Sequence, residues 1–280
     1  MGAVLAWSDP FELVSPLGTL VLNAAVEDVG TFTLMPAGCS CGNQLRIPKR
    51  SLPGGDGDIF QRRFKHGYAI TLQLLLRPAG GDDDWAGRQA MYDLLVSHLD
   101  AILDGTGRVN WTPAGADDRR MLDECSLFVP ALPGNYDQNG ILKTVTFGVE
   151  SPFPYAISYT QTQTEISDGS SETLTMVGTV YRGVSPVLKV YASTAFVIAN
   201  VTTGKTITWD STRPGGVAIA GGDWGELDCF RGTMWLNGDG ANLEAGFDLL
   251  QTKFLTLVPD ANEIQVDGAD VTVLWNHGFA

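Results

Sequence analysis

The sequence predicts a mostly β protein with two domains that follow each other along the chain. Its 280 residues exceed the usual size of one domain, and its 33 glycines and 14 prolines indicate many turns and therefore many strands. A third observation separates the domains: Ser-Pro-Phe-Pro-Tyr at residues 151–155 contains two prolines, which make the chain extended and stiff. We therefore expect an N-terminal domain over residues 1–158 and a C-terminal domain over residues 159–280.

The N-terminal domain is expected to be a β-sandwich-type domain with a single helix. Short runs of β-branched and apolar residues, bounded by turn residues, predict its strands. These strands are predicted at residues 20–22, 31–34, 68–76, 109–111, 121–129 and 142–149.

A basic, glycine-rich segment at residues 47–64 interrupts this pattern and predicts a long hairpin. Insertions of this length usually serve a function. Six basic residues lie in or beside the segment. They are Arg46, Lys49, Arg50, Arg62, Arg63 and Lys65.

One amphipathic helix is predicted over residues 84–104, because apolar residues from Met91 onward recur at the spacing of a single helix face. Asp84, the last of three consecutive aspartates, is expected to cap the start of the helix. Gly105 is expected to end it in the left-handed conformation. His98 lies on the apolar face, where a partly buried histidine with a local hydrogen bond is a better interpretation than a catalytic one.

The C-terminal domain is predicted to be an antiparallel β-sandwich. Its apolar segments are short, alternate with polar residues, and are separated by turn signals at regular intervals with no helix between them. The predicted strands are residues 174–177, 187–191, 196–201, 206–209, 217–220, 225–229, 233–236, 254–258, 263–266 and 271–275.

The composition disfavours several classes of function. A net charge of −14, from 18 basic and 32 acidic residues, argues against a protein that grips the phosphates of nucleic acid. No apolar run approaches the ~20 residues of a membrane-spanning helix, so we expect no membrane insertion. Four cysteines are too few for a disulfide framework, and the close pair Cys39 and Cys41 lacks the further ligands of a zinc site. We expect no metal and no cofactor.

No catalytic motif is present, and we expect no enzymatic activity. The nucleophile elbow, the phosphate-binding loop, the zinc-protease helix and the dinucleotide-binding glycines are all missing from the sequence. The best pair of carboxylates is Asp223 with Glu226, and Asp228 follows. On an alternating strand Glu226 and Asp228 share one face, which favours solvated surface charge over the opposed acids of a glycosidase.

Four tryptophans in the C-terminal domain raise a second hypothesis. Trp209, Trp235 and Trp275 are in phase with apolar neighbours, which favours core packing. Trp224 is expected on a turn, where an exposed ring can stack on a sugar. The alternative function is therefore a carbohydrate-binding module with an N-terminal attachment domain.

The sequence has Val-Thr-Phe-Gly-Val-Glu-Ser-Pro-Phe-Pro-Tyr at residues 145–155, followed by the strand and loop segments 186–191, 198–204 and 257–264. In these segments, and in the order of its parts, the chain resembles the distal tail protein of long non-contractile-tailed bacteriophages, the siphoviruses. In that family the last three segments mark a galectin-like sandwich. The sugar-binding residues of galectins have no full counterpart here, since Trp224-Gly-Glu matches only part of one motif. The resemblance therefore implies a scaffold role for the sandwich.

The resemblance implies a structural minor tail protein of the virion. Its first domain would form a hexameric ring at the tail tip that joins the tail tube to the baseplate or host-adsorption apparatus and lets DNA pass. Its partners would be other copies of itself, the tail tube protein, and the tape-measure and tail hub or fibre proteins. It would fold and assemble in the cytoplasm of the bacterial host. On this interpretation the basic cluster contacts acidic neighbours rather than DNA.

Overall fold

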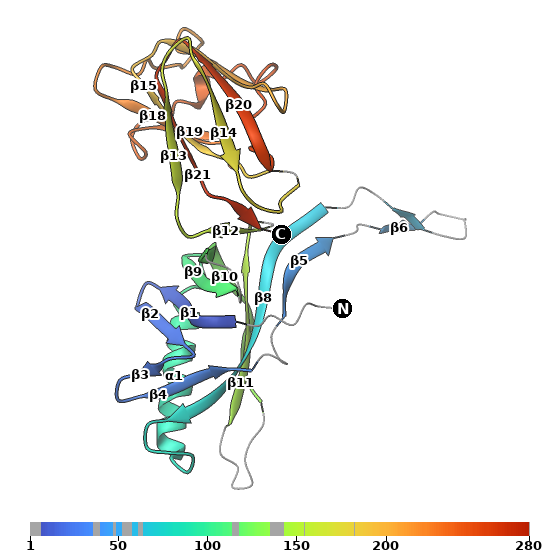
Figure 1. The fold of residues 1–280 in the computed structure, drawn as a ribbon, viewed down its shortest axis with the longest axis vertical. Helices are drawn as coiled ribbons and strands as arrows, with labels where there is room; N and C mark the ends of the chain where they lie inside the picture. The colour runs from blue at the N-terminus through green and yellow to red at the C-terminus, as the bar shows by residue number, and fades with distance from the viewer. Residues whose placement is uncertain are drawn as a thin grey trace. The chain divides into compact units, whose positions relative to one another are not determined.

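The computed structural model describes residues 7–35, 40–46, 49–51, 58–60, 64–113, 118–134, 143–153, 155–181 and 183–279. Within these residues the protein is mostly β, as the sequence predicts, with antiparallel strand pairing throughout the named sheets (Figure 1). The chain divides into two compact units, one that ends at Tyr159 and one from Thr160 to Phe279.

The first unit is built on a large antiparallel sheet with the strand order β2-β1-β9-β10-β11-β8-β4-β3. Two further strands pair beside this path, β5 with β8 and β12 with β10. The strands are β1 (Trp7–Ser15), β2 (Gly18–Leu22), β3 (Ala25–Val26), β4 (Gly30–Leu34), β5 (Ser40–Arg46), β6 (Lys49–Ser51), β7 (Asp58–Phe60), β8 (Phe64–Pro78), β9 (Gly107–Pro113), β10 (Arg120–Pro133), β11 (Thr144–Ser151) and β12 (Ala156–Ser158).

Strand β8 is the centre of this sheet. It pairs with β11 along one edge, and with β4 and then β5 along the other. Its side chains alternate as a strand requires, and the four that point into the core are completely buried. They are Ile70, Leu72, Leu74 and Leu76.

The amphipathic helix predicted from the sequence is α1 (Trp85–Asp100), which contacts β8, β10, β1 and β2. Asp84 caps its start as expected, because the Asp84 carboxylate accepts a hydrogen bond from the Gly87 main-chain N–H at 2.8 Å. Met91, Leu95 and Leu99 are buried on the sheet.

The end of the helix differs from the prediction. The helix stops at Asp100, and a tight turn follows in which the Ile102 N–H donates to the Leu99 carbonyl. Gly105 adopts the expected left-handed conformation, with φ of 76°. The turn buries Ile102 completely but leaves Leu103 56 % exposed, so Leu103 is not part of the buried stripe.

Parts of the predicted hairpin are described, and they form paired strands (Figure 1). β5 pairs antiparallel with the first half of β8, from Ser40 with Thr71 to Arg46 with Phe64. β6 pairs antiparallel with β7 in a separate two-stranded sheet, from Lys49 with Phe60 to Ser51 with Asp58. The rest of the predicted hairpin, residues 47–48, 52–57 and 61–63, lies outside the described residues.

The second unit is an antiparallel β-sandwich of two sheets. One sheet has the order β13-β21-β15-β18-β19 and the other β14-β20-β16-β17. A short 3₁₀ helix, η2 (Glu244–Gly246), follows β19. The strands are β13 (Thr162–Ile166), β14 (Ser171–Met176), β15 (Val187–Tyr191), β16 (Ala195–Asn200), β17 (Lys205–Asp210), β18 (Trp224–Asp228), β19 (Thr233–Leu236), β20 (Asp260–Asp267), β21 (Val271–Trp275) and β22 (Gly278–Phe279).

Two predictions of strands in this unit are wrong. Residues 217–220 have no strand pairing, although Ile219 is buried and its N–H donates to the Ser193 carbonyl. Residues 254–258 form only an isolated bridge between Leu257 and Val184. In both segments, apolar side chains on irregular backbone are buried in the core. The sequence pattern therefore resembles that of a strand, although the backbone makes no ladder of hydrogen bonds with a neighbouring strand.

Among the strands that the sequence missed, β13 and β1 show the opposite effect. β13 is the edge strand of its sheet and has the sequence Thr-Gln-Thr-Glu-Ile, in which only Ile166 is buried. β1 begins Trp-Ser-Asp-Pro, where a proline and two polar residues hide the strand pattern. Pairing with a neighbouring strand, rather than apolar alternation, forms these strands.

Two buried asparagines join the loops of the second unit. The Asn200 side-chain amide donates to the Thr256 carbonyl at 2.8 Å and to the Asn262 side chain at 3.3 Å. Asn262 in turn accepts from the Val258 N–H and donates to the Val258 carbonyl. Both asparagines are 0 % exposed, so these hydrogen bonds satisfy polar groups that water cannot reach.

His98 in the first unit generates a prediction about pH. Its Nδ1 lies 2.8 Å from the Ser15 hydroxyl, as expected for a partly buried histidine with a local hydrogen bond, and burial lowers its pKa below the ordinary 6.5. The unfolded state therefore binds the proton more tightly than the folded state. The free energy of unfolding should fall as pH drops below about 6.5 and through the lower folded pKa.

Urea unfolding of the wild type and of His98→Gln at about pH 7.5 and about pH 5.5 measures this effect. The wild type should lose more stability between the two pH values than the variant. Equal losses in the two proteins would show that His98 does not contribute to the pH dependence.

Candidate functional site

A groove in the described part of the first unit has a volume of ≈ 650 Å³. Its walls come from β8, from the turn after α1, from β10 and from the end of β11. The lining residues that the structure describes include no basic side chain. The lining residues are Gly67, Leu103, Asp104, Gly105, Glu124, Ser126, Glu150, Ser151 and Pro152.

Three carboxylates give this groove a negative charge. Asp104 is exposed, and Glu124 and Glu150 are partly buried. Within the described residues, no cation lies within ion-pair distance of Asp104 or Glu150. A cleft lined by one sign of charge focuses the electric field and attracts groups of opposite charge. The groove therefore favours a basic ligand or partner.

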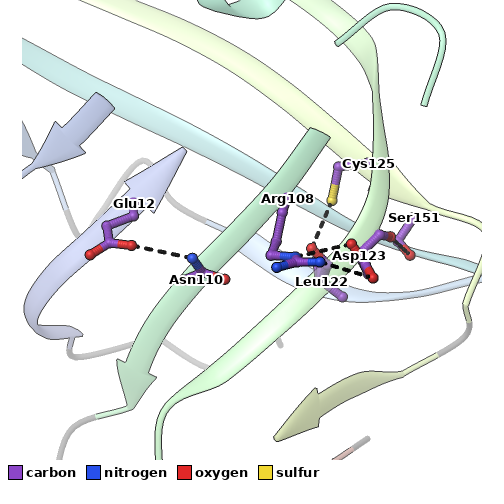
Figure 2. A network of polar contacts seen from close by, with 7 residues as sticks. All are labelled: Glu12, Arg108, Asn110, Leu122, Asp123, Cys125 and Ser151. Atoms are coloured by element: carbon purple, nitrogen blue, oxygen red, sulfur yellow. Dashed lines mark hydrogen bonds and ion pairs between the residues drawn. The ribbon is translucent and has the colours of Figure 1, made fainter. Parts of the chain in front are cut away.

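A bulge in β10 places Glu124 in the groove. The register between β10 and β9 shifts between Leu122 and Cys125, and Glu124 adopts a left-handed φ of 53°. This conformation is uncommon for glutamate and persists only where the surroundings hold it. The completely buried Cys125, whose thiol donates to the Leu122 carbonyl at 3.4 Å, anchors the bulge (Figure 2).

Beside the bulge, polar contacts connect three strands (Figure 2). Arg108 on β9 forms an ion pair with Asp123 on β10, with Nε 3.1 Å from Oδ1. The main-chain carbonyl of the same Asp123 accepts a hydrogen bond of 2.6 Å from the Ser151 hydroxyl at the end of β11. The ion pair is half-exposed and contributes little by itself, about 0–1 kcal/mol. The buried hydrogen bond from Ser151 therefore does more to hold Asp123 in place than the ion pair with Arg108.

A second group of contacts holds β1 to β9. The buried Asn110 donates to the Glu12 carboxylate at 3.2 Å (Figure 2). The same carboxylate forms an ion pair with Arg119, whose guanidinium lies 4.4 Å from the centre of the Tyr159 ring. These contacts attach the last residue of the first unit to its sheet.

The proline-rich joint lies directly against β8. The Tyr68 N–H donates to the Phe153 carbonyl at 2.9 Å, and the Phe153 N–H donates to the Ser151 hydroxyl at 3.3 Å. A Cβ atom at Gly67 would lie 1.9 Å from the Ser151 carbonyl oxygen. The chain can therefore approach β8 this closely only because residue 67 has no side chain.

Of the six basic residues predicted to make contacts, four lie on strands of the hairpin. Arg46 is on β5, Lys49 and Arg50 are on β6, and Lys65 is on β8. The register places Lys65 opposite Leu45, Lys49 opposite Phe60 and Arg50 opposite Ile59. The other two, Arg62 and Arg63, lie outside the described residues.

The tryptophans of the second unit only partly follow the predictions. Trp209 and Trp275 are buried as expected, but Trp235 is 38 % exposed on the outer face of β19. Trp224 begins β18 instead of occupying a turn, is partly buried, and has the Lys189 ammonium 5.4 Å from its ring centre. The glycan contact at Trp224 stays a prediction.

The acidic segment beside Trp224 behaves as surface charge. Leu227 and Cys229 point inward as predicted, and burial raises the pKa of the Cys229 thiol to about 12. Glu226 lies 3.8 Å from the Lys189 ammonium, and Asp228 forms an ion pair with Arg231 at 2.9 Å. In the part of the chain that the structure describes, no three His, Cys, Asp or Glu side chains gather to hold a metal ion. In the same part, no helix is long and apolar enough to cross a membrane.

The sequence did not predict the groove, because its residues come from four separate segments. Two features of the sequence lie at the groove: the proline joint at residues 151–155, and Gly67, directly before the strand predicted at residues 68–76. A glycine within a strand often marks a close approach of another backbone.

Comparison with known proteins supports the fold. No protein-family model matches the chain, and no curated protein sequence matches it. The crystal structure of the Dit protein of phage SPP1, described as a paradigm of the hub adsorption apparatus in phages that infect Gram-positive bacteria, is similar with a TM-score of 0.59. The two are 12 % identical, and the match covers 96 % of this chain and 99 % of Dit.

Chains of the phage P2 baseplate in its activated conformation, with Ca and with Sr, also align. Each is 11 % identical and covers 97 % of this chain and 99 % of its own length. Their TM-score of 0.44 is too low to assign a shared fold. The similarity to Dit, at low identity, therefore establishes a common fold and nothing more.

Gly67 gives a direct test of the joint. Gly67→Ala should destabilise the protein by about 1–3 kcal/mol, because the new methyl group meets the Ser151 main chain, which cannot move without breaking its hydrogen bonds. Gly221→Ala is the matched control, since no atom lies within 4 Å of a Cβ there. Thermal unfolding of both variants measures the difference, and equal melting temperatures would contradict the close approach.

Proposed function

We propose that this chain is a structural protein of a phage tail tip, whose first unit assembles into a hexameric ring between the tail tube and the baseplate or adsorption apparatus. The observation that carries the proposal is the common fold with the Dit protein of phage SPP1 over nearly the full length of both chains. The resemblance of residues 145–155 and of three segments in the second unit to the distal tail family supports the same assignment.

The first unit has a feature that suits ring formation. Among the described residues, β5 pairs with β8 along one of its edges, and we propose that its other edge takes part in assembly. A strand with a free edge can add to the sheet of a neighbour. A ring of identical chains needs contacts between two different surfaces of the same chain, and a projecting hairpin supplies one of them.

The charge of the protein suits a ring through which DNA passes. A net charge of −14 repels phosphates, so the ring would not hold the DNA that moves through it. The basic hairpin then serves contacts with protein. The partners would be further copies of the chain, the tail tube protein, and the tape-measure and hub or fibre proteins. The protein would assemble in the cytoplasm of the bacterial host and reside in the virion.

The carbohydrate-binding alternative depends on Trp224. Its ring is partly buried beneath the Lys189 ammonium, so a sugar would have to displace that contact before it could stack. The structural role is therefore the better-supported function, with a scaffold role for the second unit.

Ring formation predicts a particle of six times 30.0 kDa. Sedimentation of the purified protein over a range of concentrations should show this mass, and electron microscopy should show rings. A protein that remains a monomer up to its solubility limit would contradict self-assembly.

Reversal of charge in the hairpin should weaken the assembly. In Arg62→Glu with Arg63→Glu, two cations are replaced by anions, so contacts with acidic neighbours become repulsive. The sedimentation profile should shift toward the monomer at equal concentration, with an unchanged melting temperature. A profile identical to that of the wild type would show that these two residues lie outside the interface.

A further inference from the structure

We infer that the outer face of the five-stranded sheet of the second unit binds an oligosaccharide that is uncharged or carries amino groups. The site consists of two exposed aromatic rings, Tyr191 and Trp235, and of the polar side chains between and beside them. This inference goes beyond the structural role and does not rest on ring assembly. It also differs from the carbohydrate alternative above, because no sugar has to stack on Trp224.

The two aromatic rings stand on one face of the sheet. Tyr191 at the end of β15 is 37 % exposed, and Trp235 on β19 is 38 % exposed. The register pairs Tyr191 with Trp224 on β18, and two residues further along β18 Glu226 pairs with Trp235. Side chains that are paired or two residues apart share a face. Two strand spacings and the two-residue offset place the aromatic positions roughly 12 Å apart, so a ligand that contacts both is longer than one sugar ring.

A small pocket adjoins Tyr191 on the side away from Trp235. Its volume of ≈ 250 Å³ lies below the ~300–1,000 Å³ of pockets for drug-sized ligands, so it fits a single small group such as one sugar ring. A sugar has an apolar face of C–H groups and an edge of hydroxyls, and the pocket offers an aromatic ring for the first and polar groups for the second. The lining residues are Glu165, Ile166, Ser167, Tyr191, Asp270, Val271 and Thr272.

Hydrogen bonds hold Tyr191 at this pocket. Its main-chain N–H donates to the Asp270 carbonyl at 2.9 Å, and its phenol oxygen lies 3.2 Å from the Thr272 hydroxyl. Thr272 is itself 5 % exposed, so it is a fixed partner. The ring is therefore in place before a ligand arrives, which reduces the conformational entropy that binding costs.

Two carboxylates of the pocket keep acceptor capacity for a ligand. Asp270 accepts one hydrogen bond, from the Asp168 N–H at 2.9 Å, whereas an ionised carboxylate has about four acceptor positions. Glu165 lies opposite Thr272 in the register and has no hydrogen-bond or ion-pair partner in the described part of the chain. Sugar hydroxyls and amino groups are the donors that such oxygens accept.

The surface between the two rings is polar. The Lys189 ammonium lies 3.8 Å from the Glu226 carboxylate and 5.4 Å from the centre of the Trp224 ring. An apolar protein surface that covered these charges would remove their water without replacing its hydrogen bonds, which is costly. A ligand rich in hydroxyls replaces those hydrogen bonds. The mixture of aromatic and charged groups therefore favours a saccharide over an apolar protein partner.

The charge of the second unit narrows the choice of ligand. Residues 160–280 contain 6 basic and 14 acidic side chains, a net charge of −8. Nucleic acids also stack on aromatic rings, but this acidic surface repels their phosphates. The same repulsion disfavours glycans that carry carboxylate, sulfate or phosphate groups. An uncharged or amino-bearing oligosaccharide fits both the rings and the charge.

An array of oligosaccharides with neutral, amino-bearing and anionic members tests the inference. The wild-type protein should bind neutral or amino-bearing members, and calorimetry then gives its affinity for the best of them. Tyr191→Ala and Trp235→Ala should each weaken that affinity by about tenfold or more, because each removes one stacking surface.

Two control variants separate stacking from other effects. Tyr191→Phe keeps the ring and should bind nearly as well as the wild type. Tyr181→Ala removes a tyrosine that is 90 % exposed in the same unit but lies outside this sheet, and it should leave the affinity unchanged. Thermal unfolding checks that all four variants are folded.

The outcomes are distinct from those that test the proposed function. Loss of binding in the two alanine variants at Tyr191 and Trp235, with binding kept in both controls, supports the inference. Absence of binding to neutral and amino-bearing members, or binding to anionic members alone, overturns it. Binding that Tyr191→Ala and Trp235→Ala leave unchanged also overturns it, because the sugar then lies elsewhere. None of these results bears on the ring, which sedimentation tests separately.

Discussion

Continuous main-chain pairing along β8 is the constraint on which the first unit depends. The strand has 15 residues and is paired with β11 on one edge and with β4 and β5 on the other. Its completely buried side chains, such as Leu72 and Leu74, hold it in the core. The same strand then continues into the hairpin. The direction of β5 is thus set by its pairing with the first half of β8.

This constraint also positions the groove. The β10 bulge, the turn after α1 and the end of β11 surround the part of β8 next to the hairpin. Ser151 joins them because its hydroxyl binds the Asp123 carbonyl while its own carbonyl lies against Gly67. The left-handed Glu124 is held by a buried neighbour, Cys125. The carboxylates of the groove are therefore positioned by main-chain geometry that hydrogen bonds and a buried side chain hold in place.

The second unit is stabilised in a different way. Its two sheets bury alternate residues, and the loops between them are joined by Asn200 and Asn262, which hydrogen-bond to each other and to main-chain groups. Both asparagines lie in segments that resemble the distal tail family, so at least part of that resemblance has a structural cause: buried amides hold the loops. The galectin-like character of this unit stays a prediction, as does any glycan contact.

The sequence by itself determined the features that depend on local periodicity and local hydrogen bonds. These include the mostly β composition, the helix with its Asp84 cap, the basic hairpin and most strands of the second unit. It predicted burial for Leu103 and Trp235, because both are spaced with apolar neighbours on one face. In the structure, packing leaves both side chains exposed. Only the tertiary structure decided where β8 meets the joint and that Asp104, Glu124 and Glu150 share one groove. The reason is physical: periodicity reports which face of a segment is buried, whereas a groove forms where distant segments pair, and that pairing is decided by the whole sheet.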